Sequence, residues 1–124
     1  MRPAALLVHV RDWDSGFSWY KEAFPEAKIV DLPEFEFKAL RIGDFLIEVV
    51  RSDEKVSNGS AGTVLYWSVR DLLEAIAHFR RLGAELYRGP MQIEDGLGMC
   101  QVTDPFGNLI GLRGPFNKAN HSDR

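Results

Sequence analysis

A chain of 124 residues is long enough for one domain with a buried core. Hydrophobic residues make up 45% of it and charged residues 27%, which is typical of a globular protein and excludes a disordered chain. The net charge of -3 offers no basic surface for nucleic acid, and no apolar run approaches the ~20 residues of a membrane span. The start lacks a signal-peptide pattern and there is a single cysteine, so we expect a cytoplasmic protein.

The first half of the chain has the pattern of a strand, a helix and three further strands. Residues 4–10 are apolar and predict a strand, and Asp12 then stands before an aromatic stripe at helical spacing. The Asp12 carboxylate is placed to cap this helix, and Pro25 ends it. The stripe consists of Trp13, Phe17, Tyr20 and Phe24. Further strands are predicted over 27–32, 35–42 and 45–51.

A polar, glycine-containing linker over 52–61 precedes a second half with the same order of elements. Asp71, with Glu74 three residues on, begins a helix after a strand over 63–69, and Gly83 ends it. The other predicted strands lie at 85–88, 99–103 and 108–112. We expect Gly96-Leu97-Gly98 to form a mobile loop, because no phosphate-loop motif surrounds it.

The two halves form an internal repeat. Val10-Arg11-Asp12 recurs 59 residues later as Val69-Arg70-Asp71, and the helical stripe recurs at the same offset. The closing strands align at an offset of 63, as a different loop length would produce. We therefore predict an α+β domain over 1–116, made of two βαβββ modules. The modules span 4–51 and 62–113, and a disordered tail follows over 117–124.

Two groups of motifs carry a family resemblance. Val10-Arg11-Asp12 is followed by Gly16 and Trp19-Tyr20, and Asp104-Pro105-Phe106-Gly107 leads into Asn108-Leu109-Ile110. Over 4–113 the chain resembles the vicinal oxygen chelate superfamily, which includes glyoxalase I, bleomycin-resistance proteins and extradiol dioxygenases. The resemblance implies paired modules whose mixed, largely antiparallel sheets enclose a cup, with the helices outside. Many members hold a divalent metal there, and others bind a ligand without metal, commonly as homodimers.

The resemblance also indicates where metal ligands would lie. On the first strand of each module the ligand position holds Ala5 or Val64, and on the closing strands it holds Glu48 or Gly111. Only Glu48 can ligate, whereas a divalent metal needs about three protein donors. We therefore expect no metal cofactor, and keep an atypical divalent-metal site that includes Glu48 as the alternative.

Strand alternation predicts which side chains face the cup. If Ala5 does, then Leu7, His9 and the matching residues of the other strands do too, while Leu6, Val8 and Val10 pack under the helices. The lining is mostly apolar with a few polar groups, as in small-molecule sites. The candidate ligand-binding residues are His9, Glu48, Tyr66, Met99, Gln101 and Arg113.

Each polar candidate also has a structural interpretation. Glu48 either pairs with Arg113 or Lys38, or orients a ligand or acts as a general base. His9 is either a solvated rim residue or the acid–base partner of Glu48. Arg113 is either a surface cation or a clamp for an anion. We interpret Cys100 as an ordinary buried thiol.

The leading hypothesis is a metal-free, homodimeric protein of the bleomycin-resistance type that sequesters a small, partly hydrophobic molecule. The alternative is a glyoxalase-like lyase, isomerase or dioxygenase that uses an atypical metal or the Glu48 and His9 pair. A purely structural or partner-binding domain is the third possibility. The identity of the ligand depends on wall and loop residues that vary within one fold.

Overall fold

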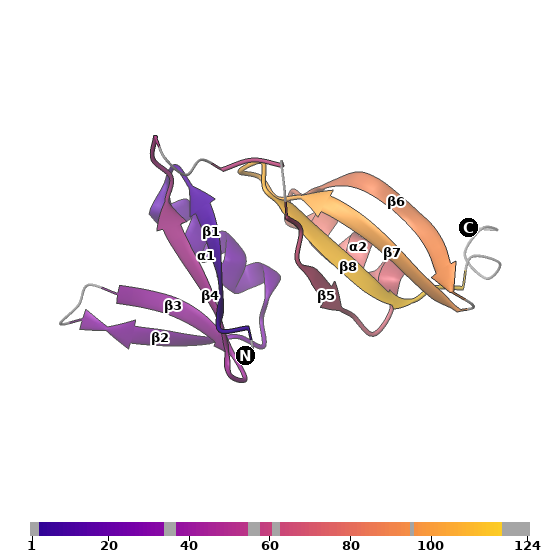
Figure 1. The fold of residues 1–124 in the computed structure, drawn as a ribbon, viewed down its shortest axis with the longest axis horizontal. Helices are drawn as coiled ribbons and strands as arrows, with labels where there is room; N and C mark the ends of the chain where they lie inside the picture. The colour runs from indigo at the N-terminus through magenta and orange to yellow at the C-terminus, as the bar shows by residue number, and fades with distance from the viewer. Residues whose placement is uncertain (1–2, 34–36, 55–57, 61–62, 95, 118–124) are drawn as a thin grey trace. The chain divides into compact units, whose positions relative to one another are not determined.

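The computed structural model describes residues 3–33, 37–54, 58–60, 63–94 and 96–117. It divides into two compact units, residues 1–58 and residues 59–124. Each unit runs strand, helix and then three strands (Figure 1). The predicted α+β fold of two βαβββ modules is therefore confirmed.

The first unit is a four-stranded mixed sheet with one helix. Its elements are β1 (Ala5–Val10), α1 (Trp13–Ala23), β2 (Lys28–Leu32), β3 (Phe37–Ile42) and β4 (Phe45–Arg51). The strand order is β1-β4-β3-β2, with β1 parallel to β4 and the other neighbours antiparallel. A parallel β1–β4 pair needs a long connection, which α1 and two strands supply. The start of the strand predicted over 35–42 lies outside the described residues.

The aromatic stripe of α1 is buried against one face of this sheet. Phe17, Tyr20 and Phe24 are all buried, together with the sheet residues Val8, Val10, Leu40, Ile47 and Val49. Trp13 stacks on Phe17 with ring centroids 4.8 Å apart, and its indole Nε1 donates to the carbonyl of Val49 at 2.7 Å. The stripe is core packing, as its spacing predicts.

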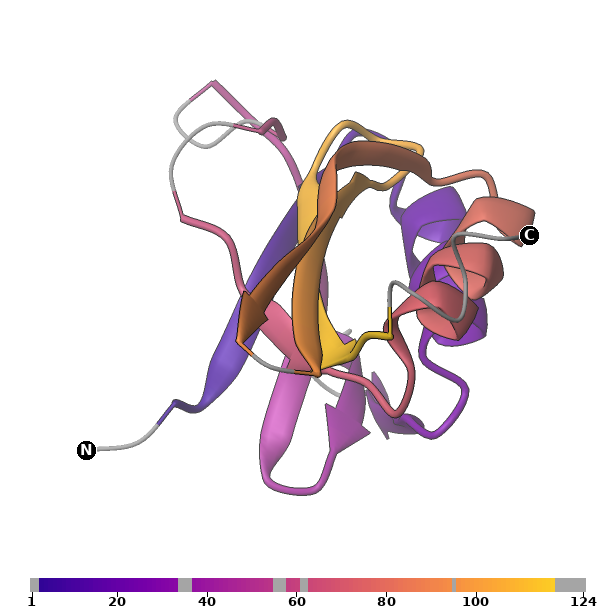
Figure 2. The ribbon, with the colours of Figure 1, turned by 90° about the vertical axis from the view of Figure 1, so that its right-hand side faces the viewer.

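The second unit repeats this arrangement. Its elements are β5 (Tyr66–Ser68), α2 (Leu72–Arg81), β6 (Glu85–Glu94), β7 (Leu97–Thr103) and β8 (Leu109–Pro115). The strand order is β5-β8-β7-β6, and β5 runs parallel to β8. Figure 2 shows α2 against one face of this sheet. The buried residues beneath it include Leu72, Ile76, Phe79, Cys100, Val102, Ile110 and Leu112.

The bounds of β5 and β6 differ most from the prediction. β5 covers only 66–68 of the predicted 63–69, whereas β6 extends from 85 to 94 instead of ending at 88. β6 passes through Gly89 and Pro90 because its pairing with β7 contains register shifts. Proline is tolerated there because β6 is an edge strand, where a missing N–H costs least.

The expectation of a loop at Gly96-Leu97-Gly98 is wrong. Gly96 lies in a turn with φ 75°, and Leu97 already begins β7. Gly98 is buried because the side chain of Phe116 lies directly against it: a Cβ at Gly98 would come within 2.6 Å of Phe116 Cβ. These glycines therefore form a hairpin and a close-packed contact.

Of the two predicted side-chain N-caps, the one on α2 is present and the one on α1 is not. The Asp71 carboxylate accepts the N–H of Glu74 at 3.0 Å, and Gly83 follows α2 with φ 90°, both as predicted. Asp12 occupies the N-cap position of α1 but makes no side-chain cap. Its Oδ2 accepts the Ser15 hydroxyl at 2.6 Å instead, and this hydrogen bond lowers the pKa of Asp12.

The turn between β7 and β8 is organised by one buried carboxylate. Asp104 Oδ1 accepts the backbone N–H groups of Phe106 and Asn108, each at 2.8 Å, and Asp104 Oδ2 accepts Asn108 Nδ2 at 3.2 Å. The Asn108 side-chain oxygen in turn accepts the N–H of Gly59 at 3.0 Å. The Asp-Pro-Phe-Gly-Asn motif therefore has a structural role.

Candidate functional site

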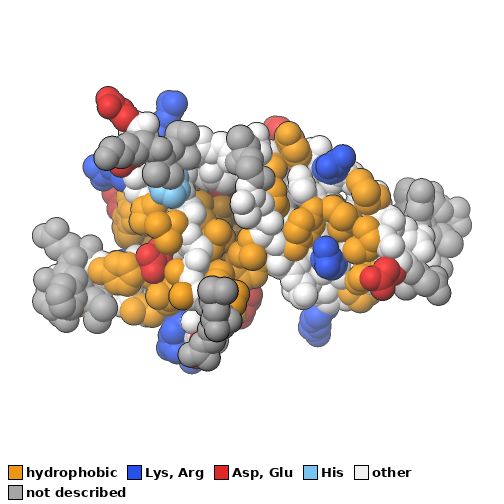
Figure 3. Space-filling view, in the orientation of Figure 1, with side chains coloured by type: hydrophobic (Ala, Val, Ile, Leu, Met, Phe, Trp, Pro, Cys, Tyr) orange, Lys and Arg blue, Asp and Glu red, His pale blue; other side chains and the backbone are white. Residues whose placement is uncertain are grey.

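Each sheet has an open face, which we define as the face turned away from the helix of its own unit. In the first unit the register partners Ala5 and Leu46, Leu7 and Glu48, and His9 and Val50 lie on it. Leu7 is 51% exposed. Figure 3 shows that hydrophobic side chains cover much of this face. The alternation predicted for β1 and β4 is confirmed, because Val8, Val10, Ile47 and Val49 are buried on the opposite side.

Glu48 is the acidic group of this face. It lies on β4 beside Leu7, is half-buried, and makes no hydrogen bond or ion pair with the residues that the structure describes. Lys38 is excluded as its partner, since the Lys38 ammonium lies over the ring of Phe17, 5.7 Å from its centroid, on the face covered by α1. His9 shares the face with Glu48 on the neighbouring strand.

The open face of the second unit has a regular arrangement of side chains. Across its four strands, register pairing forms two central rows. The first row is Arg88, Gln101, Gly111 and Tyr66. The second row is Met91, Met99, Arg113 and Ser68. The structure thus places Tyr66, Met99, Gln101 and Arg113, four of the predicted candidates, on one surface.

Tyr66 is the centre of this surface. Its hydroxyl accepts a hydrogen bond from Gln101 Nε2 at 2.8 Å, and the Arg113 guanidinium lies over its ring, 5.3 Å from the centroid. The ring covers Gly111, the residue between Tyr66 and Gln101 in the first row: a Cβ at Gly111 would come within 2.7 Å of the ring. A glycine at 111 is therefore what allows the tyrosine to reach Gln101.

Gly111→Ala tests this packing. We expect the added methyl group to displace the Tyr66 ring and lower the free energy of unfolding by about 1–3 kcal/mol. In a Tyr66→Ala background the same change should cost about 1 kcal/mol less, because the group it collides with is gone. Urea denaturation of the wild-type protein, the two single variants and the double variant measures the coupling energy between positions 66 and 111. Equal costs in both backgrounds would show that the ring does not lie on Gly111.

The superfamily's metal does not fit the residues present. Of the four ligand positions, Ala5, Val64 and Gly111 carry no donor side chain, and the Tyr66 ring fills the space over Gly111. Among the residues that the structure describes, no three His, Cys, Asp or Glu side chains form a group able to hold a metal ion. Glu48 alone is too few donors for such a site.

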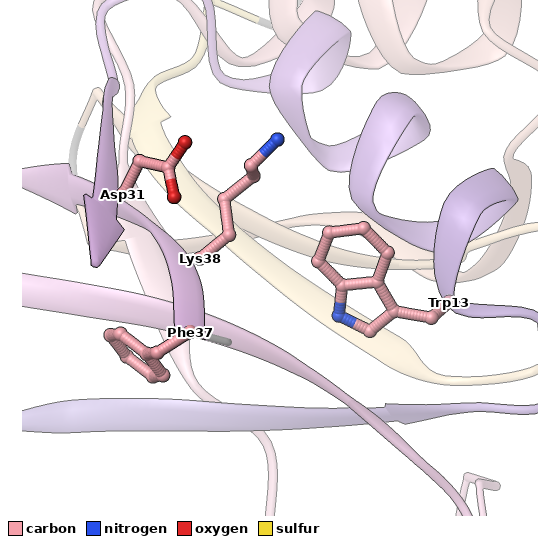
Figure 4. A pocket seen from close by; sticks show the side chains of 4 residues that line it. All are labelled: Trp13, Asp31, Phe37 and Lys38. Carbon is pink, nitrogen blue, oxygen red and sulfur yellow. The ribbon is translucent and has the colours of Figure 1, made fainter. Parts of the chain in front are cut away.

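Two features of the units were not predicted. Arg88 and Met91 belong to the central rows, but the sequence places both at or beyond the end of a short strand, so alternation could not assign their faces. On the helix side of the first unit, a hollow of about 410 Å³ is lined by Trp13, Asp31, Phe37 and Lys38 (Figure 4). Trp13 is a member of the aromatic stripe, and the hydrogen bond from its indole to the carbonyl of Val49 holds it at this hollow.

Cys100 has no features of a reactive thiol. It is fully buried on the helix side of β7, and burial raises its pKa to about 11, partly offset by the charge of Arg80. A thiol with so high a pKa is almost entirely protonated near neutral pH and is a poor nucleophile. The prediction of an ordinary buried thiol is confirmed.

Comparison with known proteins identifies proteins that share this fold. No protein-family model and no curated protein matches the sequence. The fold matches that of many solved structures, including three for which at least 90% of both chains is covered. An integron cassette protein of V. cholerae is 22% identical, covering 92% of this chain and 94% of its own, with a TM-score of 0.71. A glyoxalase/bleomycin resistance protein/dioxygenase family enzyme of Burkholderia phytofirmans PsJN is 15% identical, covering 90% and 97%, with a TM-score of 0.71.

The third is TnmS3, an antibiotic binding protein from Streptomyces sp. CB03234, which is 21% identical and covers 93% of this chain and 96% of its own, with a TM-score of 0.69. The chain has the vicinal oxygen chelate fold. At these identities the likeness establishes the fold and leaves the activity open. Within the ranges that the structure describes, no helix is long and apolar enough to cross a membrane.

Proposed function

We propose that this vicinal oxygen chelate protein binds a small, partly hydrophobic organic molecule on the open faces of its sheets, without a metal. The observation that carries the proposal is the open face of the second unit. There Met91 and Met99 supply apolar surface beside the ordered Tyr66, Gln101 and Arg113. Apolar surface with a few fixed polar groups is the composition of small-molecule sites.

The comparisons support a binding function of this kind. TnmS3, whose fold this chain shares, is an antibiotic binding protein. We also propose that the protein is a homodimer, as members of the superfamily that bind a ligand without metal commonly are. Sequestration in the cytoplasm is the physiological role that we propose.

The alternative is an enzyme in which Glu48 acts as a general base or ligates an atypical metal. The observation that favours it is the half-buried Glu48 carboxylate, which has no partner among the described residues. A carboxylate so placed is available to accept a proton or to ligate. This alternative predicts about one divalent ion per chain after purification without chelator, and loss of that ion in Glu48→Gln.

A thermal-shift screen of aromatic and hydrophobic antibiotics tests the proposal. Each compound is tested with EDTA and, separately, with added nickel, zinc, iron or manganese. We expect a subset of compounds to raise the melting temperature equally with EDTA and with metal, because a ligand that binds only the folded state stabilises it. Metal alone should cause no shift.

Two variants show whether the compounds bind at the open face of the second unit. Met99→Asp places a charge on the apolar surface and should abolish the shifts, whereas Glu74→Gln changes one exposed charge on α2 and should leave them unchanged. Shifts that require metal, or metal that stabilises the protein alone, would contradict the metal-free proposal. No shift with any compound would contradict the binding function.

A further inference from the structure

The two central rows of the second unit differ from an ordinary apolar surface in the kind of polar group that they carry. Arg88, Gln101, Tyr66, Ser68 and Arg113 all bear hydrogen-bond donors. None of the row positions holds a carboxylate. Two acidic residues that the structure describes on this face, Glu85 and Glu94, are paired with Thr103 and Leu97 at the outer ends of β7.

The guanidinium of Arg113 is held with its donors available. Its Cζ lies over the Tyr66 ring, 5.3 Å from the ring centroid, which is a cation–π arrangement. A guanidinium has five N–H donors, and contact with an aromatic ring supplies none of them with an oxygen acceptor. Arg113 makes no ion pair with a described residue, and its side chain is exposed.

A second guanidinium lies on the same surface. Arg88 is the register partner of Gln101, whose side chain is fixed by its bond to the Tyr66 hydroxyl. Arg88 also lacks an ion pair within the described residues and is exposed. In Figure 3, basic side chains stand among hydrophobic ones on this unit. Two arginines that have no acidic partner in the described part of the chain lie beside an ordered amide and hydroxyl, and this combination of donors favours binding of an anion.

The neighbouring methionines indicate what the rest of such a ligand is like. Met91 and Met99 are register partners in the second row, and Met91 is 39% exposed. Thioether side chains adapt their shape and make favourable contacts with aromatic rings. Met99 is also the register partner of Arg113, so the apolar and cationic surfaces are contiguous.

We propose that the ligand of this face is an organic anion: a flat apolar or aromatic body on Met91 and Met99, with an oxyanion such as a carboxylate or sulfonate held by Arg113 and Arg88. This inference rests on the proposed binding function and narrows it to one class of ligand. It assigns to Arg88, a residue that sequence analysis did not single out, a role in specificity.

Three naphthalene probes with different charges test the proposal. The dissociation constants of 2-naphthoate, 2-naphthamide and 2-naphthylmethylammonium are measured by isothermal titration calorimetry at low salt. The aromatic body is constant, so the comparison isolates the charged group. We expect naphthoate to bind at least about tenfold more tightly than naphthamide, the size of effect that a charge-assisted hydrogen bond supplies. The ammonium should bind most weakly.

Matched variants locate the effect. Arg113→Gln and Arg88→Gln should each lower the affinity for naphthoate about tenfold and the affinity for naphthamide much less. Arg81→Gln makes the same charge change at an exposed position of α2 and should alter neither. Because Arg88 and Arg113 are both exposed, the two variants test the idea independently if one of them folds poorly.

Equal binding of naphthoate and naphthamide, or tighter binding of the ammonium, would overturn the anion proposal while leaving the binding function intact. A naphthoate preference that Arg81→Gln weakens as much as Arg113→Gln would also overturn it, since net charge alone would then explain the effect. If no probe binds, the anion proposal fails, and the antibiotic screen decides the binding function separately.

Discussion

Asp104→Ala is expected to lower the free energy of unfolding by about 2–4 kcal/mol, as measured by urea denaturation. The Asp104 side chain is 4% exposed and accepts hydrogen bonds from the backbone N–H groups of Phe106 and Asn108 and from the side-chain amide of Asn108. Alanine leaves these donors without an acceptor in a partly buried turn. The Asn108 side chain, which also holds Gly59, loses one of its supports.

Asp104→Asn is the matched control. Both backbone N–H groups donate to Oδ1, which an amide oxygen can replace, whereas the new Nδ2 would face the donor Asn108 Nδ2. We expect a smaller loss of about 1 kcal/mol. A cost below about 0.5 kcal/mol for Asp104→Ala would contradict the structural role of the motif.

The second large effect separates the two faces of the first sheet. Leu40→Ala should cost about 2–5 kcal/mol, because Leu40 is fully buried beneath α1 and its removal leaves a cavity. Leu7→Ala removes the same atoms from a side chain that is 51% exposed on the open face. We expect Leu7→Ala to cost less than about 1 kcal/mol.

Chemical denaturation of both variants checks this pair. Similar losses for Leu7→Ala and Leu40→Ala would show that the open face is part of a folded core, with no apolar surface left for a ligand. The expected difference would mean that Leu7 contributes little to stability and leaves apolar surface exposed on the open face. Whole domains have a free energy of unfolding of only about 5–15 kcal/mol, so the loss expected for Leu40→Ala is a large fraction of the total stability.

The internal repeat made most of the fold predictable from sequence. A repeated Val-Arg-Asp motif and matching helical stripes fixed the order of elements, and period-two alternation assigned the faces of β1 and β4. The alternation also brought Tyr66, Gln101 and Arg113 together correctly. Each of these patterns can be recognised from the sequence alone, without knowledge of the tertiary contacts.

What sequence could not provide depends on irregular backbone and on packing between elements. Register shifts in β6 break the period of two, which hid the position of Arg88. Gly96 and Gly98 resembled a loop because their partner, Phe116, is distant in the chain. The cation–π contact of Arg113 with Tyr66 likewise depends on side-chain rotamers, which residue spacing does not determine.

Methyl NMR of ¹³C-methionine protein during titration with 2-naphthoate tests most directly whether the open face binds ligands. The chain has three methionines, and Met91→Leu and Met99→Leu assign the two that lie in the second row. We expect the Met91 and Met99 signals to shift, through the ring current of the naphthalene, with the dissociation constant found by calorimetry. Binding by calorimetry with both signals unmoved would place the ligand elsewhere and contradict the account.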